Sequence, residues 1–127
     1  MTEITNLGRI NVQPLEAEFG QLKTDELIIT NERIWHIKDH HPQDFDLFEE
    51  YGYLTAHDPD LVLKDGKSEN TIFMIRHLEK TNLNVVVKLI LEKEDSNHKN
   101  SVMTFFRLRD RNLKKLEARN KTLYKKK

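Results

Sequence analysis

The stretch from residue 83 to residue 91 is apolar on both of its alternating sides, which is the pattern of a buried strand. It consists of Leu, Val and Ile apart from Asn84 and Lys88, so it predicts a central strand. A lysine inside such a run is costly unless its ammonium group reaches water, an anion or a ligand. Alternation puts Lys88 on one face, while the better core face carries Val85, Val87, Leu89 and Leu91. We therefore expect Lys88 to face a cleft, with a lysine that merely extends into solvent as the alternative.

Shorter patterns on both sides of this stretch predict the remaining elements. Alternating apolar residues predict strands at residues 61–63, 71–78 and 100–108, a short edge strand at 122–124, and two more short strands at 19–22 and 26–29. Helical spacing and caps predict helices at residues 32–41, from about Pro42 to Gly52, and at 109–119.

These elements predict an α+β fold. We expect N-terminal helices packed on a roughly four-stranded antiparallel sheet, followed by a C-terminal helix and an edge strand. A chain of 127 residues is long enough for one core and too short for two. We therefore expect a single domain, in which residues 1–30 form a lead-in with short strands and residues 31–127 form the main part.

Composition narrows the class of protein. Hydrophobic residues make up 37% and charged residues 33% of the chain, which is typical of a globular protein rather than a disordered one. The lack of cysteine excludes disulfides and thiolate metal sites and fits a reducing compartment, so we expect a cytoplasmic protein. No apolar run approaches the length that spans a membrane. No Gly-rich phosphate loop is present, so we expect no nucleotide cofactor.

The net charge of zero conceals a strong asymmetry along the chain. Residues 39–60 contain seven acids and no Lys or Arg, whereas residues 107–127 contain ten Lys or Arg and two acids. Such a basic segment can attract phosphate groups even in a neutral molecule. Arg107, Lys115 and Arg119, with Tyr124 as a stacking aromatic, suit a path for single-stranded RNA. A solvated basic helix with a lysine tail is the alternative.

Three histidines lie on the first predicted helix. His36 and His40 share one helix face, His41 follows them, and imidazoles are suited to move protons near neutral pH. The same spacing also suits a zinc site, although Ile37 occupies the position of the catalytic glutamate in zinc-protease helices. A third zinc ligand would have to come from Asp39, His57 or His98. Histidines that only cap or pack are the third possibility.

The strand predicted at residues 100–108 brings further polar groups. Strict alternation puts Asn100, Val102, Thr104 and Phe106 on one face, and Ser101, Met103, Phe105 and Arg107 on the other. If Thr104 shares the face of Lys88, a hydroxyl and an ammonium group converge, and together they could hold a phosphate whose charge grows in a transition state. A threonine that is only a good strand residue is the alternative.

An ordered set of short motifs resembles the phage-associated nuclease-like domains that are grouped with barnase, EndoU, colicin-type tRNases and RelE. The matching pieces are Glu32-Arg-Ile-Trp-His-Ile-Lys-Asp-His-His-Pro42, Pro59-Asp-Leu-Val62, Asn70-Thr71, Val86-Val-Lys-Leu89, Lys99-Asn-Ser-Val-Met-Thr104 and Asn120-Lys-Thr-Leu-Tyr124. The resemblance implies N-terminal helices that lead into a four-stranded antiparallel sheet in a nuclease-like domain at residues 31–127. It also implies a metal-independent endoribonuclease that cleaves RNA by attack of a ribose 2′-OH on the adjacent phosphate.

The resemblance also implies roles for individual residues. His36 or His40 would be the general base or acid, and His40 is favoured because it lies nearer the end of the helix. Lys88 and Thr104 would stabilise the phosphorane. The RNA would be held by Asn100, Ser101, Arg107 and Tyr124. Such a protein could be a phage or mobile-element toxin with a protein inhibitor. A catalytically inactive module of the same fold, which binds nucleic acid or a protein partner in phage assembly or counter-defence, is the alternative.

Overall fold

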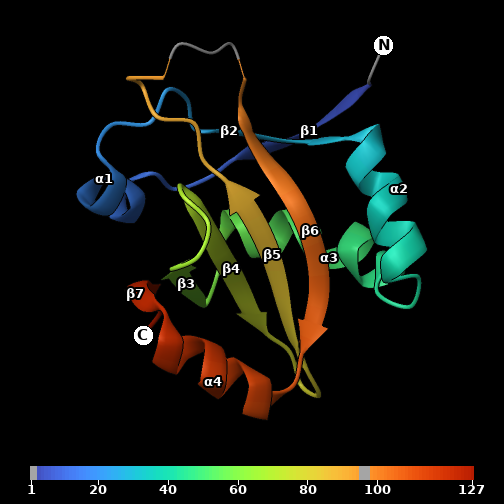
Figure 1. Ribbon diagram of the computed structural model, residues 1–127. Coiled ribbons are helices and arrows are strands. Elements are labelled where there is room, and N and C mark those ends of the chain that lie inside the picture. Colours follow the sequence, from blue (N-terminus) through green and yellow to red (C-terminus); the bar gives the residue numbers. More distant parts are fainter. Residues whose placement is uncertain (1–2, 95–97) are drawn as a thin grey trace.

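The computed structural model describes residues 3–94 and 98–127, and in this part of the chain seven strands form one sheet (Figure 1). The strands follow the order β1-β2-β6-β5-β4-β3-β7 across the sheet. Their bounds are β1 Ile4–Arg9, β2 Glu26–Thr30, β3 Leu61–Lys64, β4 Thr71–His77, β5 Asn82–Lys88, β6 Asn100–Leu108 and β7 Lys121–Lys125. The helices are α1 Gln13–Phe19, α2 Asn31–His40, α3 Phe45–His57 and α4 Asp110–Arg119. No helix of the described residues is long and apolar enough to cross a membrane.

The predicted α+β class is confirmed, but the predicted four-stranded antiparallel sheet is too small and too regular. Strands β3 to β6 form the expected antiparallel set, and β7 adds the expected edge strand next to β3. The sheet continues beyond β6 because β2 pairs with it in parallel, through Leu27–Asn100 and Ile28–Ser101, and β1 pairs with β2. The lead-in of residues 1–30 therefore contributes two strands to the same sheet.

Two local predictions are wrong for physical reasons. The strand expected at residues 19–22 is reduced to a single antiparallel bridge between Leu22 and Leu91, because α1 extends to Phe19: Pro14 suits the first turn of this helix and Leu15 packs into the core. Helix α3 does not stop at Gly52 but continues to His57. Gly52 is buried inside it, where a Cβ atom would lie 2.8 Å from the ring of Phe48, so this glycine permits packing rather than ending the helix.

The two faces of the sheet are covered differently. Helices α1, α2 and α3 cover one face, where Val85, Val87, Leu89 and Leu91 join the main core as the alternation predicts. On the other face α4 inserts Leu113 against a smaller core from β3 and β4. Figure 1 is seen from the side of α4, and no described helix crosses the upper part of β5 and β6 on this side. We call this region, which carries Val86, Lys88, Ser101 and Thr104, the open half-face.

A β-bulge in β6 corrects the predicted alternation of this strand. Val86 lies opposite Thr104, but Val87 lies opposite Val102, so Met103 is an extra residue in β6. The extra residue lets both Val102 and Phe105 point into the main core. It also places Ser101 and Thr104 together on the face of Lys88, although strict alternation separates them.

Candidate functional site

A row of polar residues crosses three strands at one end of the open half-face. Lys88 is exposed at the end of β5, with Thr71 of β4 on one side and Ser101 of β6 on the other. The hydroxyl of Thr71 donates a hydrogen bond to the carbonyl of Glu69 at 3.0 Å. Lys88 forms no ion pair or hydrogen bond with any side chain in the described residues. Its ammonium group is therefore available to an anion.

Thr104 lies on the face of Lys88, as the predicted phosphate site requires, but its hydroxyl is turned inward. Its Oγ1 atom is buried and has no hydrogen-bond partner in the described part of the chain. On the same face, Asn84 is fully buried and both polar atoms of its amide are unpaired within the described residues. A phosphate resting on Lys88 at the surface would not contact a buried hydroxyl.

Asn100 serves the fold rather than an open site. Its Nδ2 donates to the carbonyls of Thr24 at 2.8 Å and Glu26 at 2.9 Å, and its Oδ1 accepts from the backbone N–H of Ile90 at 3.0 Å. The residue is fully buried. Its amide therefore joins the ends of β2, β5 and β6, and it has no free donor for RNA.

The histidines form a stacked pair on the surface of α2. This helix begins with the Thr30 side chain, which accepts a hydrogen bond from the Arg33 N–H at 3.2 Å, and it packs through the buried Ile37. The rings of His36 and His40 stack with centroids 4.2 Å apart, and His40 Nδ1 lies 3.1 Å from the carbonyl oxygen of His36. The side chain of His40 is 58% exposed.

In the described residues no three His, Asp or Glu side chains are grouped as a metal site would need.

The loop between α2 and α3 is fastened to the far end of β6 through Asp44. One oxygen of this buried carboxylate accepts the backbone N–H of Arg107 at 3.2 Å, and the other forms an ion pair with the Arg107 guanidinium. Gln43 Oε1 also lies within reach of Arg107 Nη2, at 3.4 Å. Arg107 is thereby fixed at the surface.

Two adjoining hollows meet at this Asp44–Arg107 pair. The first is completed by His40, His41, Pro42 and Gln43, and the second by Lys80, Thr81, Arg109 and Asn112. We call the two together the arginine groove. It lies between the end of α2, the turn between β4 and β5, and the start of α4.

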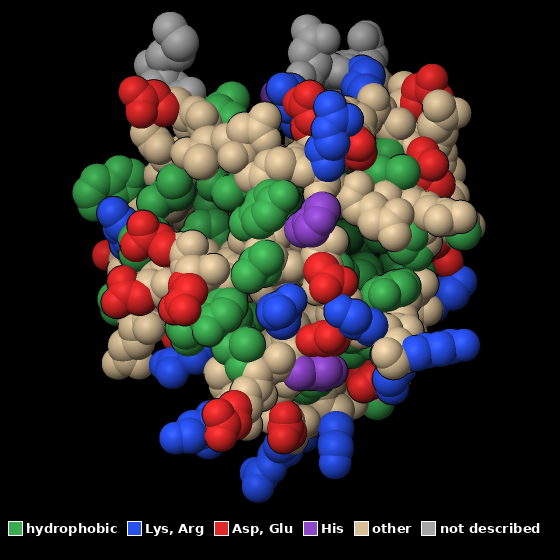
Figure 2. Space-filling view, turned by 180° about the vertical axis from the view of Figure 1, so that it is seen from behind, with side chains coloured by type: hydrophobic (Ala, Val, Ile, Leu, Met, Phe, Trp, Pro, Cys, Tyr) green, Lys and Arg blue, Asp and Glu red, His purple; other side chains and the backbone are tan. Residues whose placement is uncertain are grey.

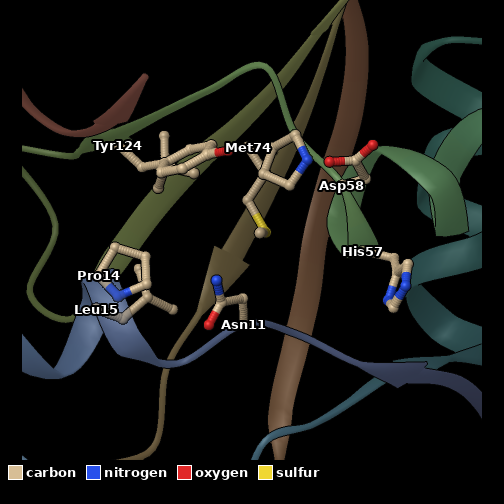
Figure 3. A pocket seen from close by; sticks show the side chains of 9 residues that line it. Asn11, Pro14, Leu15, His57, Asp58, Met74 and Tyr124 are labelled. Carbon is tan, nitrogen blue, oxygen red and sulfur yellow. The ribbon is translucent and has the colours of Figure 1, made fainter. Parts of the chain in front are cut away.

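The other predicted RNA contacts are dispersed. Lys115 is exposed on α4, and Arg119 lines a separate hollow beside the loop at residues 65–70. Tyr124 lies on β7 and lines a small cavity with Asn11, Met74 and Asp58 (Figure 3). Figure 3 shows Tyr124, Met74 and Asn11 pointing toward one another across this cavity.

The predicted site residues therefore fall into two groups linked by β6. Lys88, Ser101 and Thr104 share the open half-face, whereas His40 and Arg107 share the arginine groove. Arg107 lies six positions after Ser101 in the sequence, which is about 20 Å along a strand. The sequence reasoning missed Lys80, and it gave no site role to Thr71, which was only part of a motif, or to Arg109, which was only part of the basic segment, because the register of distant strands and the turn geometry bring them to these places.

The side of the molecule that carries α1, α2 and α3 exposes several large apolar side chains. Ile4, Trp35, Tyr53 and Leu54 are the most exposed of them in the described residues, and Trp35 is 68% exposed. Figure 2 shows hydrophobic side chains gathered over the half of this view where α2, α3 and β1 lie. The Lys38 ammonium group lies 5.2 Å from the centroid of the Trp35 ring, a distance typical of a cation–π contact.

Comparisons with protein-family models, with curated proteins and with solved structures find no match for this chain.

Proposed function

We propose that this protein binds single-stranded RNA across the open half-face and cleaves it by metal-independent transphosphorylation. The observation that carries the proposal is the unpaired Lys88 ammonium group between Thr71 and Ser101, on a part of the sheet that no described helix covers. Because Lys88 is exposed and unpaired among the described residues, its ammonium group can bind a phosphate oxygen. The motifs that resemble the nuclease-like domains include these three positions.

In the proposed reaction a water molecule accepts the proton of a ribose 2′-OH next to the phosphate that Lys88 holds. The 2′ oxygen then forms a bond to the adjacent phosphorus atom, the bond to the 5′ oxygen breaks, and water donates a proton to that oxygen. The products are a 2′,3′-cyclic phosphate and a 5′-hydroxyl. Lys88 stabilises the extra negative charge of the phosphorane. The histidine role that the resemblance implies does not fit this site, because His40 lines the arginine groove, about 20 Å along β6 from Ser101, and a general base must lie within hydrogen-bond reach of the proton that it removes.

The experiment is an RNA cleavage assay in excess chelator with folded variants. Lys88→Ala should lower the rate of cleavage by about 100-fold or more, whereas His40→Ala should not lower it to that extent, because His40 lies in the other hollow. Lys93→Ala removes an exposed lysine from another hollow and should leave the rate unchanged. Cleavage that survives Lys88→Ala would refute the proposed site.

A binding module without catalysis is the second candidate function, and two observations favour it. The two histidines stack on each other, and the hydroxyl of Thr104 is buried, so the predicted acid, base and phosphorane donors do not surround one open spot. In that case RNA binds without cleavage, the affinity falls steeply with salt, and only Lys88→Ala weakens it.

A further inference from the structure

The arginine groove combines three cationic side chains with one carboxylate. Arg107, Arg109 and Lys80 line it, and the carboxylate of Asp44 is directed at Arg107. Lys80 and Arg109 form no ion pair with any described residue. The groove therefore has an excess of positive charge. The hollow beside residues 65–70 also has more cations than carboxylates, although its Lys64 and Lys121 are both paired with Glu18.

The start of α4 adds backbone donors to the same groove. Arg109 is the N-cap residue, has an extended backbone and forms no side-chain cap, and the groove is lined by Arg109 and Asn112. The first N–H groups of a helix have no acceptor within the helix and attract anions. The carboxylate of Asp110, which could occupy this place, instead accepts a hydrogen bond from Asn82 Nδ2 at 2.8 Å. Guanidinium groups and helix N–H donors together are suited to phosphate oxygens.

We infer that the arginine groove binds a backbone phosphate of the same RNA strand whose cleavage site lies at Lys88. This inference rests on the proposed function, since it treats the groove as a second contact on one substrate. The two contacts lie about 20 Å apart along β6, and Arg107 is on the opposite face of the sheet from Lys88, because it pairs with Leu83 of the main core. A strand must therefore pass around the end of β6 and extend over more than roughly 4 nucleotides to occupy both.

The first test measures binding of a fluorescent 2′-O-methyl RNA, which cannot be cleaved by its own 2′ oxygen. The double variant Lys80→Ala with Arg109→Ala should bind a strand of about 12 nucleotides at least tenfold more weakly, and its salt slope should fall by about 0.7 for one lost phosphate contact. Binding of a strand of about 3 nucleotides, which reaches only one contact, should change little. The control Lys67→Ala with Lys93→Ala removes the same charge from the other hollow and should bind like the wild type.

The second test does not depend on RNA. Pyrophosphate added to the wild-type protein should shift the backbone amide signals of residues 109–112 in NMR spectra, and the double variant should lose this shift. If the long RNA binds through Lys88 but equally well in the double variant, the groove is refuted and the proposed function stands. If pyrophosphate shifts these signals but no RNA binds, the groove is a phosphate site and the RNA assignment is refuted. No shift, or a shift caused only by an acidic peptide, overturns the inference.

Discussion

Replacing Asn84 by leucine should stabilise the protein, although the substitution lies in the centre of the sheet. Asn84 is fully buried between Ile75 of β4 and Phe106 of β6, and neither its Oδ1 nor its Nδ2 has a partner in the described residues. A polar group buried without a hydrogen bond has lost its contacts with water and gained none in exchange. Leucine has nearly the same shape and no polar atoms.

The expected size follows from the two unpaired groups. Each unpaired group lowers the free energy of unfolding of the wild type by about 1–3 kcal/mol. An imperfect fit of the leucine side chain reduces the gain in the variant by up to about 1.5 kcal/mol. The free energy of unfolding of Asn84→Leu should therefore exceed that of the wild type by about 2 kcal/mol. For a domain of this size the melting temperature should rise by roughly 4–8 °C.

The assay is urea unfolding followed by circular dichroism, with the slope m expected to stay constant. Thr55→Val is the matched control, because Thr55 on α3 is also fully buried, and its hydroxyl has no hydrogen-bond partner among the described residues. It should gain about 1 kcal/mol. A loss of about 1 kcal/mol or more in Asn84→Leu would refute the reasoning and indicate that a buried water satisfies the amide.

Three further predictions concern the parts that hold the fold together. Asp44→Ala should lower the free energy of unfolding by about 2 kcal/mol, because it removes the carboxylate that accepts the backbone N–H of Arg107 and pairs with the guanidinium group; an unchanged urea midpoint would contradict this. Gly8→Ala should cost about 2 kcal/mol, since φ is +92° and a Cβ would lie 2.5 Å from the Tyr53 ring; pairing it with Tyr53→Ala should relieve the clash but not the backbone strain. Hydrogen bonds from the ammonium groups of Lys121 and, second, Lys64 lower the pKa of Glu18. These ion pairs therefore stabilise the folded protein fully above the ordinary glutamate pKa of about 4.3, and the stabilisation is lost as the pH falls through the lowered pKa. Unfolding midpoints of Glu18→Gln should accordingly vary less with pH below that point than those of the wild type.

Local patterns predicted the elements whose signals are strong. The apolar run around Lys88 is a central strand, the bounds of β6 agree with the expected residues 100–108, and α2 starts within one residue of the expected residue 32. Strand β1 could not be predicted, because it lies at the edge with mostly exposed residues and shows no alternation. The parallel pairing of β2 with β6 joins segments about seventy residues apart, and short-range periodicity carries no information about it.

The candidate site could be predicted only in part, for the same reason. The alternation of β5 predicts that Lys88 points away from the main core. The register of β6 against β5, which puts Thr104 on the same face, is known only from the structure. The inward Thr104 hydroxyl and the structural use of Asn100 depend on packing from other segments. The place of Lys80 beside Arg109 depends on how the turn after β4 meets the start of α4. Interactions between segments distant in the chain decide all three.

The short pairing of β2 with β6 has a consequence for how this protein would fail. Beyond Ser101 the described residues give β6 no strand neighbour on that side, and α2 lies there instead, with Arg33 Nη1 3.5 Å from the carbonyl of Met103. An uncovered strand edge is a template for pairing with another chain. Substitutions that unwind α2 should therefore increase the rate of aggregation more than substitutions that destabilise α4 to the same extent. Helix α2 thus also protects the edge of β6 from pairing with another chain.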